Sequence, residues 1–133
     1  MLVSIAFVAW PARMYNDKVL GHFHQPVGVG QLANYDGRAR RCNPVCGDEV
    51  ELYLALEADR VADVAFQASG CVATVASLSC LCGLLKGATL EQAMSLTQED
   101  LLDQLGGLPK NKSHGAALAI STLRAALKEA GVE

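Results

Sequence analysis

The sequence predicts an α+β domain in which helices pack on one face of a small antiparallel three-stranded sheet. In the first part of the chain, apolar residues alternate with polar ones, as they do in half-buried strands. In the second part they recur at spacings of three and four residues, which is typical of helices. Strands followed by helices favour the α+β class. The 133 residues, of which 51% are hydrophobic, suit one domain with one core.

A short helix is predicted near the start of this domain. Asn16 is a favourable N-cap, and Asp17 would lie in the first turn, near the positive end of the helix dipole. Pro26 disfavours a helical conformation in the residue before it, so the helix should end at about His24. The Gly-rich residues 27–36 are expected to form a loop.

Two strands are predicted from strict alternation of apolar with polar or small residues. The apolar positions of the two runs are Val50, Leu52, Leu54 and Leu56, and then Val64, Phe66 and Ala68. Residues 57–60 form the predicted turn, and a connection this short favours an antiparallel hairpin. Residues 38–43 are predicted to add an earlier strand.

Two longer helices are predicted from apolar stripes of helical period, one after Gly70 and one at the C-terminal end of the chain. The stripes are Leu78, Leu81, Cys82 and Leu85 in the first helix, and Ala116, Ile120, Leu123 and Leu127 in the second. Gly87 and Gly131 supply their C-terminal stops. Ser113 or Asn111 can cap the second helix.

Two short helices are predicted between the longer ones. Thr89 with Gln92 matches a capping box for a helix that runs to about Leu96. Thr97 can cap the next helix, which should end at Leu105 because glycines follow.

Net charge and the placement of basic residues argue against a nucleic-acid-binding protein. The formal net charge is −3. The basic residues gather only in two small groups, Arg38, Arg40 and Arg41 and then Lys110 and Lys112. Nucleic-acid binders carry a clustered basic surface, whereas groups this small are typical of solvated faces.

The cysteine count and the first residues indicate a cytoplasmic protein without a membrane segment. Five cysteines are an odd number, which argues against a disulfide framework and for reduced thiols. Residues 2–10 are almost all apolar, but a bilayer span takes about 20 residues and a signal peptide begins with positive charge. We expect residues 1–13 to form an N-terminal extension and residues 14–133 to form the domain.

Four residues with metal-binding side chains lie at the ends of predicted elements. Cys46 precedes the first strong strand and Asp48 begins it, while Cys71 follows the second strand at the start of the long helix. Because the start of one hairpin strand lies beside the end of the next, Cys46 and Asp48 should lie near Cys71. His114, in the first turn of the last helix, can complete a set of four. Thiolates, a carboxylate and an imidazole bind soft or borderline metals, so the sequence predicts a metal or cluster site.

Each of these four residues also has a structural alternative. Cys46 and Cys71 can be buried packing residues, since free cysteine is among the most buried residue types. Asp48 can cap or pair at a strand edge, and His114 can lie at the surface or cap its helix.

The remaining cysteines and histidines are expected mainly to be structural. Cys42 can supply a further sulfur if the following loop folds back, or it can be a packing residue, which we favour. Cys80 and Cys82 lie within the long helix and should pack in the core. His22 and His24 should cap the first helix or lie at the surface.

The motifs, taken in order, resemble those of the IscU/NifU-type iron–sulfur cluster assembly scaffolds, a family with a NifU-like N-terminal domain. The resemblance runs from Met14 to Ala130. The matching segments are Tyr15-Asn16-Asp17-Lys18-Val19 with His22 and Pro26, Cys46-Gly47-Asp48, Phe66 with Gly70-Cys71, Ala73 and Ala76-Ser77, Lys86-Gly87 with Leu90 and Ala93, and Leu108-Pro109 through His114.

The resemblance implies a non-enzymatic scaffold on which a transient [2Fe–2S] cluster forms before it passes to recipient apo-proteins. It implies thiolate ligands from Cys46 and Cys71, a nitrogen ligand from His114, and a hard oxygen ligand or modulator in Asp48. The same four groups can hold Zn²⁺ in an apo-like form. The implied partners are a cysteine desulfurase and the recipient apo-proteins.

The sequence departs from the family pattern at two places. The family usually has a third cysteine directly after the histidine, where it is a main acceptor of sulfur from the desulfurase, but Gly115 stands here. The alternatives are a zinc-bound sulfur acceptor that uses Cys46 or Cys71, and a degenerate zinc-binding homologue. The family's chaperone-binding stretch reads Leu-Pro-Pro-Val-Lys, whereas this chain has Leu108-Pro109-Lys110-Asn111-Lys112. We therefore do not expect docking of the dedicated Hsp70-type chaperone.

Overall fold

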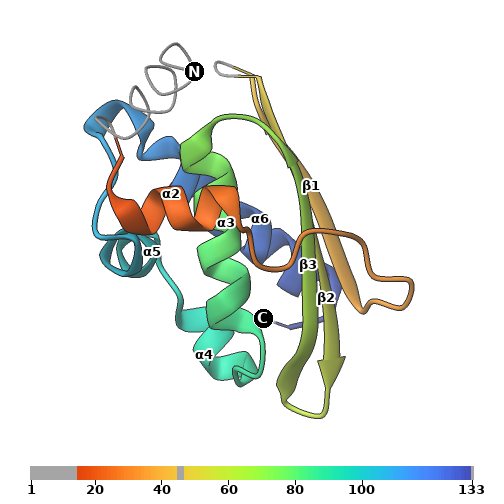
Figure 1. The fold of residues 1–133 in the computed structure, drawn as a ribbon. Coiled ribbons are helices and arrows are strands. Elements are labelled where there is room, and N and C mark those ends of the chain that lie inside the picture. Colours follow the sequence, from red (N-terminus) through yellow and green to blue (C-terminus); the bar gives the residue numbers. More distant parts are fainter. Residues whose placement is uncertain (1–14, 45–46, 133) are drawn as a thin grey trace.

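The computed structural model describes residues 15–44 and 47–132, and it shows a sheet with helices on one side of it (Figure 1). The predicted extension, residues 1–13, lies outside the described residues, and so does Cys46. None of the helices in the described ranges combines the length and the hydropathy that a bilayer span requires.

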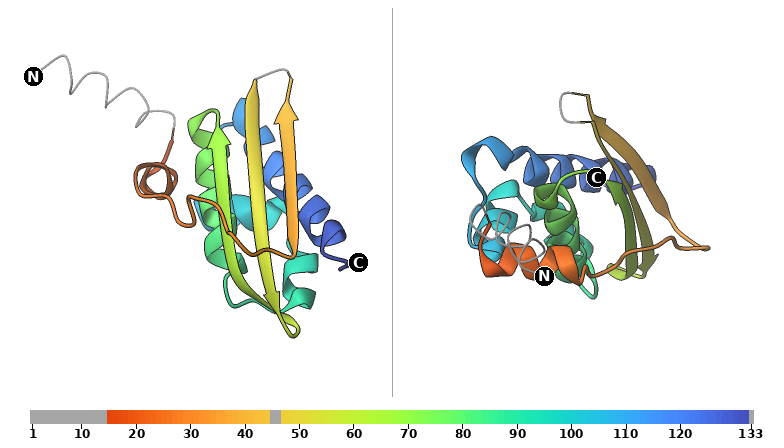
Figure 2. Two further views of the ribbon diagram at one scale, coloured as in Figure 1. Left: turned by 90° about the vertical axis from the view of Figure 1, so that its right-hand side faces the viewer. Right: turned by 45° about the horizontal axis from the view of Figure 1, so that its top comes forward.

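The sheet consists of three antiparallel strands, as predicted, and their order is β1-β2-β3 (Figure 2). Its strands are β1 (Gly37–Asn43), β2 (Asp48–Glu57) and β3 (Arg60–Ser69). Glu49 pairs with Ser69, so the start of β2 lies beside the end of β3. Leu52 pairs with Phe66 on the buried face, where both side chains contribute to the core.

The helices cover that buried face of the sheet (Figures 1 and 2). They are α2 (Asp17–His24), α3 (Val72–Leu85), α4 (Leu90–Ser95), α5 (Gln98–Leu105), the 3-10 turn η1 (Lys110–Lys112) and α6 (His114–Glu129). The α+β class with helices on one face of a small sheet is thereby confirmed. α6 packs beneath β1, and α3 packs beneath β3.

Local capping patterns explain where three of the helices begin. The Asn16 side chain accepts a hydrogen bond from the backbone N–H of Val19, and Thr89 and Thr97 form capping boxes at α4 and α5. The prediction for α6 was wrong in one respect. Ser113 stands at the N-cap position, but its hydroxyl donates to the carbonyl of Lys110 at 3.2 Å and caps nothing.

α3 differs from the one-sided helix that its apolar stripe predicts. Buried residues surround it, and they include the polar residues Thr74, Ser77 and Ser79. The reason is its central place, because α2, α5, α6 and β3 all pack against it (Figure 1). Each of its buried hydroxyls has a hydrogen-bond partner. That of Ser77 donates to the carbonyl of Ala73 within the helix at 2.6 Å, whereas those of Thr74 and Ser79 bond to other elements.

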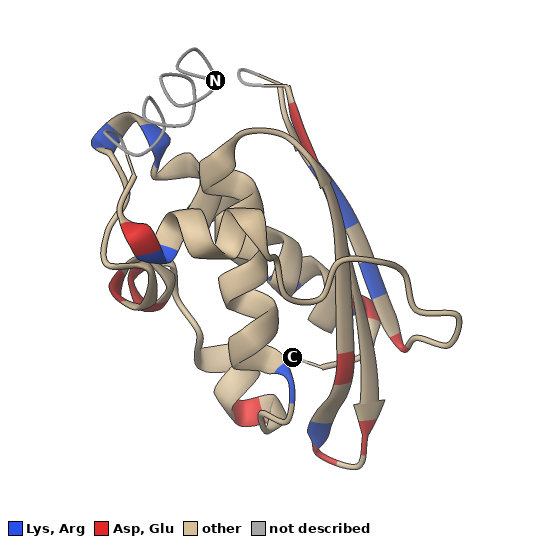
Figure 3. Cartoon of the chain, viewed as in Figure 1, with Lys and Arg blue, Asp and Glu red and all other residues tan. Residues whose placement is uncertain are grey.

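The basic residues of β1 face acidic residues of β2 across the sheet. Arg38 lies 2.7 Å from Glu51, and Arg40 lies 3.2 Å from Glu49. Basic and acidic positions follow one another along the sheet (Figure 3). Charges of both signs therefore alternate on the outer face of the sheet, where exposed pairs of this kind contribute at most about 1 kcal/mol each to stability.

Candidate metal centre

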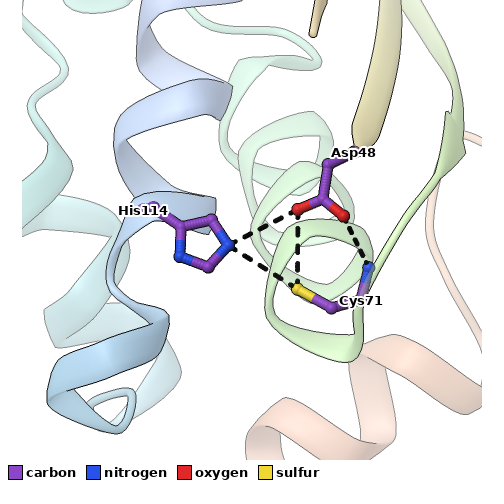
Figure 4. Close-up of side chains that lie close together, drawn as sticks. All are labelled: Asp48, Cys71 and His114. Carbon is purple, nitrogen blue, oxygen red and sulfur yellow. Dashed lines mark hydrogen bonds and ion pairs between the residues drawn. The ribbon is translucent and has the colours of Figure 1, made fainter. Parts of the chain in front are cut away.

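The structure brings three of the four predicted site residues together at one end of the sheet. Asp48 is the first residue of β2, Cys71 is the N-cap of α3, and His114 is the first residue of α6. Figure 4 shows their side chains pointing toward one another from these three elements. The antiparallel pairing of β2 with β3 explains the approach of Asp48 to Cys71, and the packing of α6 on α3 adds His114.

The spacing of the three donor atoms matches one face of a tetrahedral metal site. Asp48 Oδ2 lies 3.4 Å from His114 Nε2 and 3.6 Å from Cys71 Sγ, and that sulfur lies 3.9 Å from the same nitrogen. Bonds of about 2.0 Å to oxygen or nitrogen and about 2.3 Å to sulfur, arranged tetrahedrally, place ligand atoms about 3.3–3.5 Å apart. Small adjustments of these side chains would therefore let all three bind one ion.

Asp48 is held in place by hydrogen bonds to both of its oxygens. Oδ1 accepts from the backbone N–H of Cys71 at 3.1 Å, and Oδ2 accepts from the hydroxyl of Thr74 at 2.7 Å. The residue is only 2% exposed. Because each oxygen has a donor, the carboxylate can be buried here without a full counter-charge.

Gly70 makes room for this carboxylate. A β-carbon at position 70 would lie 2.5 Å from Asp48 Oδ1, which is closer than any real contact. The glycine before Cys71 is therefore required by the position of the Asp48 side chain.

Sequence reasoning missed one residue of this cluster. Thr74 was not predicted to take part, yet its hydroxyl lies 2.7 Å from Asp48 Oδ2 and 3.5 Å from Cys71 Sγ. Its spacing of three residues from Cys71, on the same helix, is a signal that could have found it. Tyr15 lies near enough to the site to feel its charges. Burial, and then the negative charges of Cys71 and Asp48, raise the pKa of the Tyr15 hydroxyl.

Comparison with known proteins then decides the family. A family model described as the NifU-like N terminal domain matches residues 14–130. The protein belongs to the NifU-like N-terminal domain family.

Relatives of this NifU-like chain include two named scaffold proteins. The chain is 41% identical over 114 residues to the iron–sulfur cluster assembly scaffold protein IscU 1 of Archaeoglobus fulgidus, covering 86% of this chain and 74% of that protein. It is 38% identical over 117 residues to the scaffold protein IscU of Aquifex aeolicus, with the same coverages.

A solved structure of the N-terminal part of a NifU-like protein from Brucella abortus has the same fold. It has a TM-score of 0.73 at 20% identity and covers 90% of this chain and 96% of that one. At this level of identity the likeness concerns the fold alone.

The further cysteine considered for the NifU-like site, Cys42, faces away from it. Cys42 pairs with Glu49 on the outer face of the sheet, whereas Asp48 is on the buried face. Neighbouring strand residues point to opposite faces, so the sulfur of Cys42 cannot reach the carboxylate in this register. The favoured interpretation of Cys42 as a packing residue was also wrong, because it is exposed.

The missing third cysteine of the NifU-like pattern has a steric explanation. A β-carbon at Gly115 would lie 2.8 Å from the carbonyl carbon of Ala73 and 2.9 Å from the backbone nitrogen of Thr74. These are backbone atoms of α3, which cannot move aside as a flexible side chain can. α6 therefore approaches α3 too closely for any side chain at position 115.

The two other described cysteines are core residues, as predicted. Cys80 and Cys82 are buried in α3, and burial raises their thiol pKa values to about 11 and about 12. Of the two remaining histidines, His24 is exposed and His22 is half-buried, with its Nδ1 2.7 Å from the hydroxyl of Ser79.

Proposed function

We propose that this NifU-like protein is an iron–sulfur cluster assembly scaffold that binds iron and a transient [2Fe–2S] cluster and passes the cluster to recipient apo-proteins. The observation that carries the proposal is the convergence of Asp48, Cys71 and His114, whose ligand atoms all lie within 4.8 Å of one another. The relatives named as scaffolds support the same function.

Each donor has a distinct part in this proposal. Cys71 supplies a thiolate at the N-terminus of α3, where the helix dipole favours negative charge. His114 supplies a nitrogen, and Cys46, two residues before Asp48 in the sequence, is proposed as the second thiolate. Asp48 supplies a hard oxygen, which suits a soft cluster less well than a thiolate and so favours release of the cargo.

The cluster is cargo, and its parts must come from other proteins. We propose that a cysteine desulfurase supplies the sulfur, and that apo-proteins lacking their clusters are the recipients. The site lies at the end of the sheet where His114 keeps 23% of its side-chain surface exposed. Partial exposure at this edge is compatible with transfer between proteins.

Anaerobic reconstitution tests the scaffold function. The full chain, mixed with ferrous iron, sulfide and a thiol, is expected to develop the charge-transfer absorption of a cysteine-bound cluster. Cys71→Ala and Cys46→Ala should lose this absorption. Cys42→Ser is the matched control, because Cys42 is exposed on the opposite face of the sheet and should not matter. Failure of the unaltered chain to form a cluster under these conditions would refute the scaffold function.

A zinc-bound sulfur acceptor is the second candidate. It is favoured by the spacing of the three donor atoms, which lie close enough together to bind one metal ion. In this reaction a thiolate of the protein attacks the outer sulfur of a desulfurase persulfide, the S–S bond breaks, and the desulfurase thiolate leaves. Mass spectrometry after mixing with desulfurase and cysteine should show one added sulfur atom on Cys71 or Cys46. The names of the relatives favour the scaffold over this candidate.

A further inference from the structure

Thr74 links two of the proposed ligands through one buried hydroxyl. It lies in the first turn of α3, three residues after Cys71, and it is 0% exposed. Its Oγ1 lies 2.7 Å from Asp48 Oδ2 and 3.5 Å from Cys71 Sγ. The hydroxyl of Thr74 therefore contacts two of the three donor residues, Asp48 and Cys71.

The direction of the hydrogen bond follows from the donors available. An ionised carboxylate only accepts hydrogen bonds, and a threonine hydroxyl has one hydrogen to donate. The shorter distance, 2.7 Å to Asp48 Oδ2, therefore identifies the acceptor. The other oxygen, Oδ1, is already taken by the backbone N–H of Cys71 at 3.1 Å.

These two bonds fix the rotation of the Asp48 carboxylate. Oδ1 is turned toward the backbone of Cys71, whereas Oδ2 is turned toward Cys71 Sγ and His114 Nε2 (Figure 4). A carboxylate oxygen has two lone pairs, so besides the hydroxyl of Thr74 the oxygen Oδ2 has one further lone pair, on the side of Cys71 Sγ and His114 Nε2. Only one oxygen of Asp48 therefore faces the point where an ion would contact all three donors.

We propose that Thr74 is a positioning residue. It holds the carboxylate of Asp48 in the orientation of a monodentate ligand and thereby sets the metal affinity of the site. The proposal rests on the metal centre described above. Hydrogen-bond partners that orient metal ligands typically account for a 10–100-fold difference in metal affinity. Without the hydroxyl, the carboxylate can rotate, and its buried Oδ2 loses a donor.

Zinc affinity of the full chain, measured by competition with a chromogenic chelator, tests the proposal. Thr74→Val keeps the shape but removes the hydroxyl, and we expect it to weaken Zn²⁺ binding about 10–100-fold. Thr74→Ser restores a hydroxyl and should restore most of the affinity. Thr122→Val is the matched control, because Thr122 is also 0% exposed but its hydroxyl donates to the carbonyl of Leu118, outside the site.

The visible absorption bands of the Co²⁺-loaded protein provide a second readout, since they depend on the geometry of the ligands and not on overall stability. Thr74→Val should change these bands, whereas Thr74→Ser and Thr122→Val should keep them. If Thr74→Val does not fold, Thr74→Ala tests the same loss of hydroxyl with less bulk. Parent-like affinity and bands in the folded variant without the hydroxyl would overturn the positioning role.

The two proposals fail in different ways. Asp48→Ala, Cys71→Ala and His114→Ala must each weaken Zn²⁺ binding if the metal centre exists. If none of them does, the metal centre is wrong and the role of Thr74 falls with it. If they do and Thr74→Val does not, only the positioning role is wrong.

Discussion

Gly115 of α6 lies directly against the backbone of Ala73 in α3, at a distance that leaves no space for a β-carbon. The nearest atom to such a carbon would be the carbonyl carbon of Ala73, at 2.8 Å. This contact brings the start of α6, and with it His114, beside the N-terminus of α3. The residue that removes a cysteine from the family pattern therefore also allows the close approach of the two helices.

Replacing Gly115 should destabilise the protein. We expect Gly115→Ala and Gly115→Cys to lower the free energy of unfolding by about 1–3 kcal/mol, because the new atoms meet backbone that cannot relax cheaply. Urea denaturation measures this effect. Gly83→Ala in α3 is the control: its β-carbon would meet nothing within 4 Å, so it should be neutral or stabilise the helix by up to about 1 kcal/mol. A Gly115→Cys variant as stable as the parent would contradict the steric argument.

Replacing Gly70 should weaken metal binding more than it weakens the fold. A β-carbon there would lie 2.5 Å from Asp48 Oδ1, and a side chain can turn away from such a contact more readily than backbone can. Gly70→Ala should therefore displace the Asp48 carboxylate and lower Zn²⁺ affinity, as measured by chelator competition. Gly21→Ala in α2, where a β-carbon would meet nothing within 4 Å, should leave the affinity unchanged. Equal affinities in the two variants would show that Gly70 is not needed to place Asp48.

The stability of the protein should fall as the pH drops below about 6.5, through His22. Burial lowers the pKa of this imidazole below its ordinary value of 6.5. Its Nδ1 lies 2.7 Å from the hydroxyl of Ser79, which also accepts from the backbone N–H of Val27 at 2.8 Å. Below pH 6.5 the unfolded chain binds a proton that the folded chain resists, so the free energy of unfolding decreases until the folded pKa is reached.

Urea denaturation at several pH values measures the contribution of His22. As the pH falls from about 7.5 to below 6.5, the free energy of unfolding of His22→Gln should decrease less than that of the parent protein. His24→Gln should keep the loss, because His24 is exposed at the end of the same helix. An unchanged pH dependence in His22→Gln would assign the effect to other groups.

Thiol reactivity should separate the two buried cysteines of α3 from the exposed Cys42. At about pH 8, Cys80 and Cys82 should resist alkylation in the folded protein, since burial raises their pKa values to about 11 and about 12 and keeps them as thiols. Cys42 is exposed and should react first. Mass spectrometry of alkylated peptides, before and after unfolding in urea, follows each site. Rapid labelling of Cys82 in the folded protein would contradict the packing of α3.

Local sequence signals predicted most of the elements because their causes are local. Asn16, Thr89 and Thr97 cap their helices through residues three positions away, and the alternation in β2 and β3 reflects one buried face of a sheet. The burial of α3 on nearly all sides could not be predicted in this way. It depends on which elements surround the helix, and small or polar residues such as Ser77 do not reveal that.

The pattern of residues along the chain predicted the three strands, the order of the helices and the candidate ligands Cys46, Asp48, Cys71 and His114. Two features became visible only in the folded protein: Cys42 faces the far side of the sheet, and Thr74 joins the site. Both outcomes depend on contacts between distant segments: the register of β1 against β2 sets the first, and the 26-residue separation of Thr74 from Asp48 hides the second. Such contacts leave no periodic trace in the chain, because they arise from how the elements pack and not from how each one forms.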